Sequence, residues 1–166
     1  FIELCQKQYD IVLMNPPFGE VSIASRDYLY KSYQSASQDI FSAFIERATN
    51  LMDKGTIGTI TNRLAFSREL LRDWREQYLL SNNWSLTVAV DLGYGVLDTA
   101  MVEAAAYIIS NVSSGDRIKI INSLSIQDKE KTTISSIKSL ININIHNKNL
   151  FKLIPNSIIA YWCSPK

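Results

Sequence analysis

Short apolar runs and stretches with helical spacing alternate along the first half of the chain. Residues 9–14 form a nearly continuous apolar run, which predicts a strand buried on both faces. Between residues 40 and 52 apolar side chains recur at three- and four-residue steps, which predicts a helix that begins near residues 35–38 and ends at Lys54-Gly55. Residues 19–35 are mixed and polar, and predict a connection longer than the ~4–6 residues that usually join elements.

The same order of strand and helix is then repeated. Residues 56–61 (TIGTIT) are rich in β-branched side chains and predict a second strand. A second predicted helix follows, with one apolar and one charged face. Its apolar face carries Phe66, Leu70, Leu71, Trp74 and Tyr78, and its solvated face carries Arg68, Glu69, Arg72, Arg75 and Glu76. Strand, helix, strand and helix at this spacing predict an α/β fold with a parallel sheet.

Two further apolar runs, residues 86–92 and 102–109, are joined by a wide loop that contains Gly93 and Gly95. They predict an antiparallel hairpin, which we expect at the edge of the parallel sheet. The fold predicted for this part of the chain is therefore a mixed sheet of parallel strands plus an antiparallel edge hairpin.

The pattern weakens towards the end of the chain. It predicts a strand at residues 117–122 and a helix at 129–140. We therefore divide the chain into a first part, residues 1–112, and a strand and helix extension, residues 113–166.

Composition changes this picture little. The 166 residues are 46% apolar, which is enough for a globular domain with its own core. The 17 basic and 16 acidic residues give a formal charge of +1, so any contact with nucleic acid must come from local placement of charge. Cys5, His146 and Cys163 do not have the spacing of a metal site, and both thiols are expected to be reduced. The sequence has no apolar run long enough for a membrane span and no signal peptide, which predicts a cytoplasmic location.

The end of the first predicted strand is unusual. It runs directly into Asn15-Pro16-Pro17-Phe18-Gly19. Two successive prolines fix two φ angles and remove two backbone donors, so the backbone here is stiff. Gly19 leaves space for the close approach of a ligand.

A stiff pair of acceptors suits the activation of an exocyclic amine for attack on an electrophilic methyl group. The amine lone pair is delocalised into the planar base until acceptors draw its two N–H bonds aside. Asn15 can accept from one N–H through its side-chain oxygen, and Pro16 can accept from the other through its carbonyl. Stacking of the base on Phe18 is worth about 1–3 kcal/mol. The motif can therefore hold and activate a base amine.

Asn15-Pro16-Pro17-Phe18 at the end of an apolar strand resembles the catalytic motif of the amino-group methyltransferases that use S-adenosylmethionine. The adenine-N6 DNA members of that family carry Asn/Asp-Pro-Pro-Tyr/Phe. Four further segments, in order along the chain, resemble type IIG restriction-methyltransferases and BREX phage-exclusion methyltransferases: residues 38–48, 55–62, 90–96 and 154–162. The resemblance implies that the chain forms the C-terminal part of a Rossmann-like methyltransferase sheet.

The resemblance also implies substrates and residue roles. Residues 1–112 would be the catalytic-motif half of a methyltransferase domain, and residues 113–166 would lead towards a target-recognition region. The substrate would be double-stranded DNA with a flipped adenine, and S-adenosylmethionine would be the cofactor. The implied catalytic residues are Asn15, Pro16, Pro17 and Phe18, with Asn15 also beside the cofactor and Phe18, Tyr94 and Leu97 against the base.

Two features differ from the family pattern. Family members place a glycine-rich cofactor turn upstream of the Asn-Pro-Pro motif, and nothing before Tyr9 matches it. They also tend to carry a Phe where Leu97 stands. We therefore expect a piece of a longer protein, inactive by itself, whose upstream part completes the cofactor site. The edge of the strand at residues 9–14 would then be exposed, and we expect self-association through it.

Three functions remain open from the sequence. The leading one is adenine-N6 methylation of DNA in a restriction-modification or phage-defence system. Methyl transfer to RNA or to a protein glutamine poses the same chemical problem to an Asn-Pro-Pro-aromatic motif. The third is a non-catalytic interaction or DNA-binding fragment.

Several other residues receive structural interpretations. Arg63, Arg68, Arg72 and Arg75 can contact phosphates, but Arg68, Arg72 and Arg75 also fit the solvated face of a helix, which is the interpretation that we favour. We interpret Asp91 as a turn residue at a strand end. The tyrosines at positions 28, 30 and 33 are expected to pack on their own domain rather than on DNA.

Overall fold

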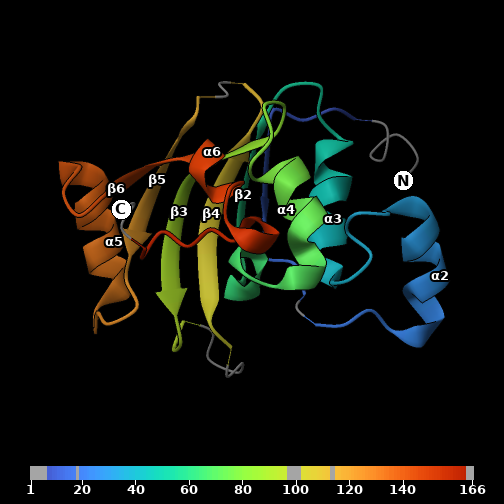
Figure 1. Ribbon diagram of the computed structural model, residues 1–166, viewed down its shortest axis with the longest axis horizontal. Helices are drawn as coiled ribbons and strands as arrows, with labels where there is room; N and C mark the ends of the chain where they lie inside the picture. The colour runs from blue at the N-terminus through green and yellow to red at the C-terminus, as the bar shows by residue number, and fades with distance from the viewer. Residues whose placement is uncertain (1–6, 18, 97–101, 113–114, 164–166) are drawn as a thin grey trace.

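A computed structural model of the protein describes residues 7–17, 19–96, 102–112 and 115–163 (Figure 1). These residues build a six-stranded mixed sheet with the order β1-β2-β4-β3-β5-β6. The strands are β1 (Ile11–Met14), β2 (Thr56–Asn62), β3 (Ser85–Gly93), β4 (Ala104–Ser110), β5 (Arg117–Asn122) and β6 (Asn144–Asn147). Strands β1, β2, β3 and β5 run in one direction, and β4 and β6 run against them. The predicted mixed α/β sheet is thereby confirmed.

Helices and short 3-10 turns surround this sheet. The helices are α2 (Ile23–Ser32), α3 (Ile40–Thr49), α4 (Arg72–Tyr78), α5 (Lys129–Ser139) and α6 (Lys148–Phe151), and the turns are η1 (Arg63–Phe66), η2 (Glu69–Leu71) and η3 (Pro155–Ser157). Figure 1 shows α3 and α4 near β2 and β4, α2 beyond α3 at the rim, and α5 at the opposite end beside β5 and β6.

The two faces of the sheet are packed differently. One face contributes to the main core together with α3 and α4, where Phe41 meets Trp74 edge to face at a ring-centroid distance of 5.7 Å. The other face has a smaller cluster that includes Val90. On β1, Ile11 is 65% and Leu13 is 80% exposed. The prediction that this strand is buried on both faces is therefore wrong for the described residues, because helices cover only one side of it.

The predicted hairpin is present, with Val90 of β3 opposite Ala106 of β4. Its predicted place at the edge is wrong, because β2 pairs with β4 and β5 pairs with β3. The edges of the sheet are β1 and β6. The extension therefore continues the same sheet, while the division of the chain at residue 112 stays a prediction.

Helix α2 occupies the segment that was predicted to be a connection. It begins at a side-chain cap, in which the Ser22 hydroxyl accepts a hydrogen bond from the Ser25 N–H at 3.3 Å. Of its side chains only Leu29 is buried. The sequence pattern missed the helix because it lacks the apolar stripe that periodicity detects. Its Tyr28 packs on Tyr33, with ring centroids 6.4 Å apart, whereas Tyr30 is exposed.

The second predicted helix is interrupted. The turns η1 and η2 precede α4, with Ser67 and Arg68 between the turns. This interruption shifts the helical phase, so the faces assigned from a continuous helix do not hold. Leu70, predicted to be buried, is 58% exposed, and Arg75, predicted to face solvent, is fully buried.

Two negative findings apply to the described residues. No helix among them has the length and apolar character needed to cross a membrane. No group of three or more His, Cys, Asp or Glu side chains within the same residues is arranged to hold a metal ion. Cys163 is a free, exposed thiol, and Cys5 lies outside the described residues.

Candidate active site

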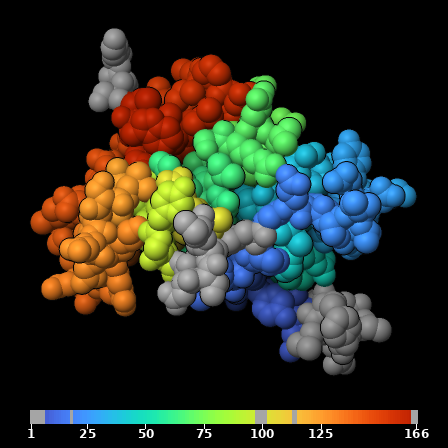
Figure 2. All heavy atoms as spheres, turned by 90° about the horizontal axis from the view of Figure 1, so that it is seen from below, coloured from blue at the N-terminus to red at the C-terminus, as the bar shows by residue number. Residues whose placement is uncertain are grey.

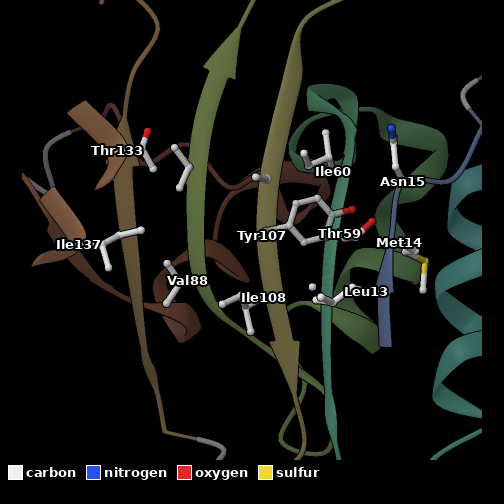
Figure 3. Close-up of a pocket in the computed structure, with 13 residues that line it drawn as sticks. Leu13, Met14, Asn15, Thr59, Ile60, Val88, Tyr107, Ile108, Thr133 and Ile137 are labelled. Atoms are coloured by element: carbon white, nitrogen blue, oxygen red, sulfur yellow. The ribbon is translucent and has the colours of Figure 1, made fainter. Parts of the chain in front are cut away.

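The predicted catalytic motif lies at the carboxyl end of β1. Met14, the last residue of the strand, pairs with Thr59 of β2, and Asn15 follows with an exposed side chain. Figure 3 shows Asn15 at the same end of the sheet as the arrowhead of β3. Pro16 is buried and Pro17 exposed, while Phe18 lies outside the described residues.

Residues 15–19, called here the Asn15 loop, are held at both ends by backbone hydrogen bonds. Before the loop, Met14 pairs with Thr59 in the parallel ladder that joins β1 to β2. After it, the Ile40 N–H at the start of α3 donates to the Gly19 carbonyl at 3.3 Å. Gly19 has a φ of +124°, a conformation that side-chain-bearing residues rarely adopt. The backbone on either side of the loop is therefore fixed to neighbouring elements, while the stiffness expected from the two prolines stays a prediction.

Beside this loop, Asp39 precedes α3 and is almost fully buried. An Arg68 Nη atom lies 3.2 Å from its Oδ2. Burial raises the pKa of the Asp39 carboxyl, and the positive charge of Arg68 opposes that rise. The ion pair links the segment after the Asn15 loop to the turns before α4.

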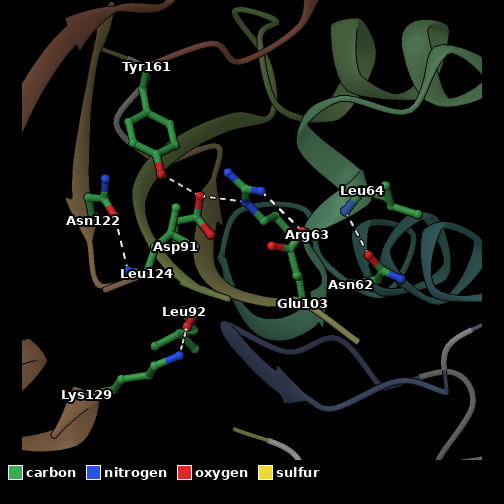
Figure 4. Close-up of polar contacts among 10 residues, drawn as sticks. All are labelled: Asn62, Arg63, Leu64, Asp91, Leu92, Glu103, Asn122, Leu124, Lys129 and Tyr161. Atoms are coloured by element: carbon green, nitrogen blue, oxygen red, sulfur yellow. Dashed lines mark hydrogen bonds and ion pairs between the residues drawn. The ribbon is translucent and has the colours of Figure 1, made fainter. Parts of the chain in front are cut away.

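A second polar cluster lies at the carboxyl ends of β2 and β3 (Figure 4). The Arg63 Nε donates to the Asp91 Oδ2 at 2.7 Å, and an Arg63 Nη atom lies 3.2 Å from the Glu103 carboxylate. The Tyr161 hydroxyl also donates to Asp91. Burial lowers the pKa of Arg63, but the hydrogen bonds and charges of the two carboxylates outweigh it and raise that pKa. The Arg63 guanidinium is 5.6 Å from the centre of the Trp162 ring.

This cluster corrects the interpretation of Asp91 as a turn residue. Asp91 belongs to β3 and is fully buried, and its carboxylate is paired. A signal was present in the sequence, because an acidic residue within the apolar run LTVAVDLG needs a buried partner. The partners themselves come from residues 63 and 161, which the sequence does not connect.

The base-contact candidate Tyr94 lies in the turn that follows β3, and its side chain is 62% exposed. The turn needs glycine on either side of it, since Gly93 has a φ of +63° and Gly95 a φ of +78°. The Lys129 ammonium at the start of α5 donates to the carbonyls of Leu92 and Tyr94. Leu97, the other candidate in this loop, lies outside the described residues.

Asn15 and Tyr94 both lie at the carboxyl ends of the parallel strands, but the two residues are not in contact. Figure 1 draws the arrowhead of β3 pointing down, and Figure 2, seen from below, looks onto this edge. Asn15 follows β1 and Tyr94 follows β3, with β2 and β4 between those strands. Three strand spacings amount to about 14 Å. A group held by both residues would have to bridge that gap.

A concavity with a volume of about 570 Å³ lies on the open face of the sheet (Figure 3). Its lining is mostly apolar and includes Leu13, Ile60, Val88, Ile108 and, from α5, Ile137. Asn15 lies at its margin and is one of its few polar side chains. The concavity is thus an uncovered sheet face that reaches the candidate catalytic residue, and no group of polar side chains converges in it.

Comparison with known proteins finds methyltransferases. The model of the Eco57I restriction-modification methylase family matches residues 1–96. The adenine-specific methyltransferase BrxX of Escherichia coli O9:H4 (strain HS) is 27% identical over 173 residues, which cover 95% of this chain and 14% of that protein. The chain therefore spans about one seventh of the length of this curated relative.

Solved structures share the fold. The methyltransferase subunit of a type I restriction-modification system from Streptococcus thermophilus superimposes with a TM-score of 0.65 at 12% identity, over 92% of this chain and 37% of that one. A protein from Listeria monocytogenes assigned to the class I S-adenosylmethionine-dependent methyltransferases superimposes with a TM-score of 0.61 at 13% identity, over 80% of this chain and 42% of that one. At such identities the likeness establishes the fold.

Proposed function

The chain belongs to the Eco57I restriction-modification methylase family, and from this premise we propose that it is part of an adenine-N6 DNA methyltransferase. The enzyme would act in the cytoplasm, within a restriction-modification or phage-defence system. One observation carries the proposal: the Asn15-Pro16-Pro17 motif lies at the carboxyl end of a parallel strand in a methyltransferase sheet, with the Asn15 side chain exposed. Ligands of open α/β sheets bind outside this end of the strands.

In this proposal the Asn15 loop activates the adenine amine. The Asn15 side-chain oxygen accepts one N–H of the flipped base, and the Pro16 carbonyl accepts the other. None of the described residues forms a hydrogen bond with the Asn15 side chain, so its oxygen is available to a ligand. Pro17 keeps the backbone stiff, and Phe18, Tyr94 and Leu97 supply surfaces against the base.

The cofactor implied by the fold is S-adenosylmethionine, which supplies an electrophilic methyl group when it is bound. The described residues fit one side of such a site, since Asn15 is exposed at the edge strand and its amide offers both a donor and an acceptor. A glycine-rich turn, which would form the other side, does not occur among residues 1–8. We therefore propose that an upstream part of the same protein completes the cofactor site.

The exposed surfaces support this division of the site. β1 is an edge strand, and the unpaired side of such a strand is a template for another strand. The neighbouring sheet face is apolar and open, with Ile11 and Leu13 largely exposed. Both features are those of a surface that another part of a protein covers.

The proposal is tested by methyl transfer from labelled S-adenosylmethionine to DNA with the full-length protein. We expect Asn15→Ala to lower the rate at least ~100-fold, by analogy with the loss of one preorganised hydrogen-bonding group at a reacting centre. Asn82→Ala, at another exposed asparagine, is the matched control and should keep the wild-type rate. An Asn15→Ala protein as active as wild type would refute the assigned role, and label found only in RNA or protein would refute the substrate.

Calorimetric titration of S-adenosylmethionine into the 166-residue chain tests the division of the cofactor site. We expect no binding to this chain and binding to the full-length protein. Micromolar binding to the chain itself would mean that residues 1–166 assemble the cofactor site, and the proposal of an upstream half would be wrong.

A further inference from the structure

A polar cleft beside the Asn15 loop offers donors that suit a phosphodiester. We propose that this cleft binds a backbone phosphate of the DNA strand that carries the target base. The cleft has a volume of about 350 Å³, and its lining includes Glu20, Arg26, Tyr30, Ser37, Gln38 and Arg68. This inference rests on the proposed function, and it adds a DNA contact outside the catalytic motif.

The cleft adjoins the catalytic motif in both sequence and space. Glu20 follows the Asn15 loop directly, five positions after Asn15 along the chain. Five residues span at most about 17 Å, which corresponds to about five base-pair steps along the axis of a DNA duplex. On the face shown in Figure 2, the blue surface of α2 borders the green surface of residues 63–80, and both contribute side chains to the cleft.

Arg68 is positioned for an anion on the wall opposite α2. Its contact with the buried Asp39 at 3.2 Å fixes the guanidinium, while a quarter of its side chain stays exposed. Its other terminal nitrogen lies 3.9 Å from Glu20, whose side chain is 84% exposed. A contact of that length at the surface contributes little, so a phosphate can displace the Glu20 carboxylate.

Asp39 neutralises the charge of Arg68, whereas the positive charge of Arg26 has no such partner within the described part of the chain. It is exposed on α2, and no acidic side chain among the described residues lies within ion-pair distance of it. A guanidinium can donate two parallel hydrogen bonds to a phosphate, and the Tyr30 hydroxyl and Gln38 amide add neutral donors. With a formal charge of +1 on the whole chain, such local pairs of arginines are the places where DNA contacts can arise.

Arg72 provides a matched control. It is more than half exposed, on α4, and its Nε donates to Glu76 at 3.0 Å within the same helix. It does not line the cleft. Loss of Arg72 removes the same formal charge as loss of Arg26 without touching the cleft.

The experiment measures DNA affinity of the full-length protein at several salt concentrations. Each phosphate contact contributes about 0.9 to the slope of log affinity against log salt. We expect Arg26→Gln to lower the magnitude of the slope by about 0.9 and Arg26→Lys to retain it. Arg72→Gln should leave the slope at the wild-type value.

The outcomes separate the two proposals. If the wild-type protein binds DNA and Arg26→Gln keeps its slope, the phosphate cleft is refuted and the proposed function stands. The cleft is also refuted if Arg26→Gln and Arg72→Gln lower the slope equally, because the effect would then reflect net charge. If the wild-type protein does not bind DNA, the proposed function fails and the cleft with it.

Discussion

Arg75 shows how one side chain can hold distant segments together. Its Nε donates to the Ser157 carbonyl at 2.8 Å, and its terminal nitrogens donate to the carbonyls of Ala65, Arg68 and Asn156. Burial lowers the pKa of this guanidinium to about 10, so it remains charged at neutral pH. The planar fork satisfies carbonyls on two segments that are more than 80 residues apart in the chain.

Replacement of Arg75 should destabilise the fold. Arg75→Met removes the donor from the buried carbonyls of Ala65 and Ser157 and from the partly buried carbonyl of Asn156, and each orphaned group costs about 1–3 kcal/mol. We expect the free energy of unfolding to fall by at least ~3 kcal/mol in urea denaturation followed by tryptophan fluorescence. Arg72→Met, on the exposed face of the same helix, should leave the midpoint unchanged. A stable Arg75→Met variant would show that water or neighbouring groups replace these hydrogen bonds.

At the scale of elements, α5 is connected to the loop that follows β3. Lys129 occupies the first position of the helix, where a positive charge is unfavourable because it meets the positive end of the helix dipole. Its ammonium instead donates to the Leu92 and Tyr94 carbonyls. The extension after residue 112 therefore fixes the backbone that presents Tyr94.

Because Lys129 fixes the backbone of Tyr94, its loss should change how the target base is positioned as well as the stability of the fold. In the full-length protein, Lys129→Met should lower kcat/KM for methylation about tenfold or more, since hydrogen bonds to a charged donor are worth about 1.5–3 kcal/mol. It should also change the fluorescence of 2-aminopurine placed at the target position. Lys131→Met, at an exposed lysine two residues along α5, is the control. Unchanged kinetics and fluorescence in Lys129→Met would remove Lys129 from any role in positioning Tyr94.

At the scale of the whole molecule, the sheet is incompletely covered. Helices α3 and α4 pack on one face, while the open face carries a concavity of about 570 Å³ with a largely apolar lining. The outer edge of β1 is unpaired within the described residues. A chain with both features exposes apolar surface and unpaired backbone groups together, which favours association.

We therefore expect the 166-residue chain to self-associate when it is separated from the rest of the protein. Sedimentation velocity should detect dimers or larger species, and Leu13→Lys should shift the distribution towards monomer because Leu13 lies on the open face of the edge strand. Ile23→Lys, at an equally apolar and 87% exposed position on α2, should leave the distribution unchanged. A compact monomer at all concentrations would contradict the prediction.

Local sequence patterns determined several parts of this molecule. The runs at residues 56–61 and 117–122 form strands, the spacing from residue 40 onwards forms α3, and the parallel and antiparallel strands combine in one mixed sheet. The apolar run at residues 9–14 placed the Asn15-Pro16-Pro17 motif at the end of a strand, which the structure confirms, while the stiffness and the acceptor roles of these residues stay predictions. The assignments of strands and of α3 succeed because hydrophobic periodicity depends on neighbouring residues.

Only the tertiary structure decided which polar residues meet. It buried Arg75 against the segment at residues 156–157, paired Asp91 with Arg63 and Tyr161, and placed Arg26 and Arg68 in the lining of one cleft. In the structure β4 lies between β2 and β3, so the hairpin is in the interior of the sheet and not at the predicted edge. The partners in each case are separated by tens of residues, and no local pattern encodes their distance. Their contacts follow from the burial of apolar faces across the whole chain, which brings the polar residues of those segments together.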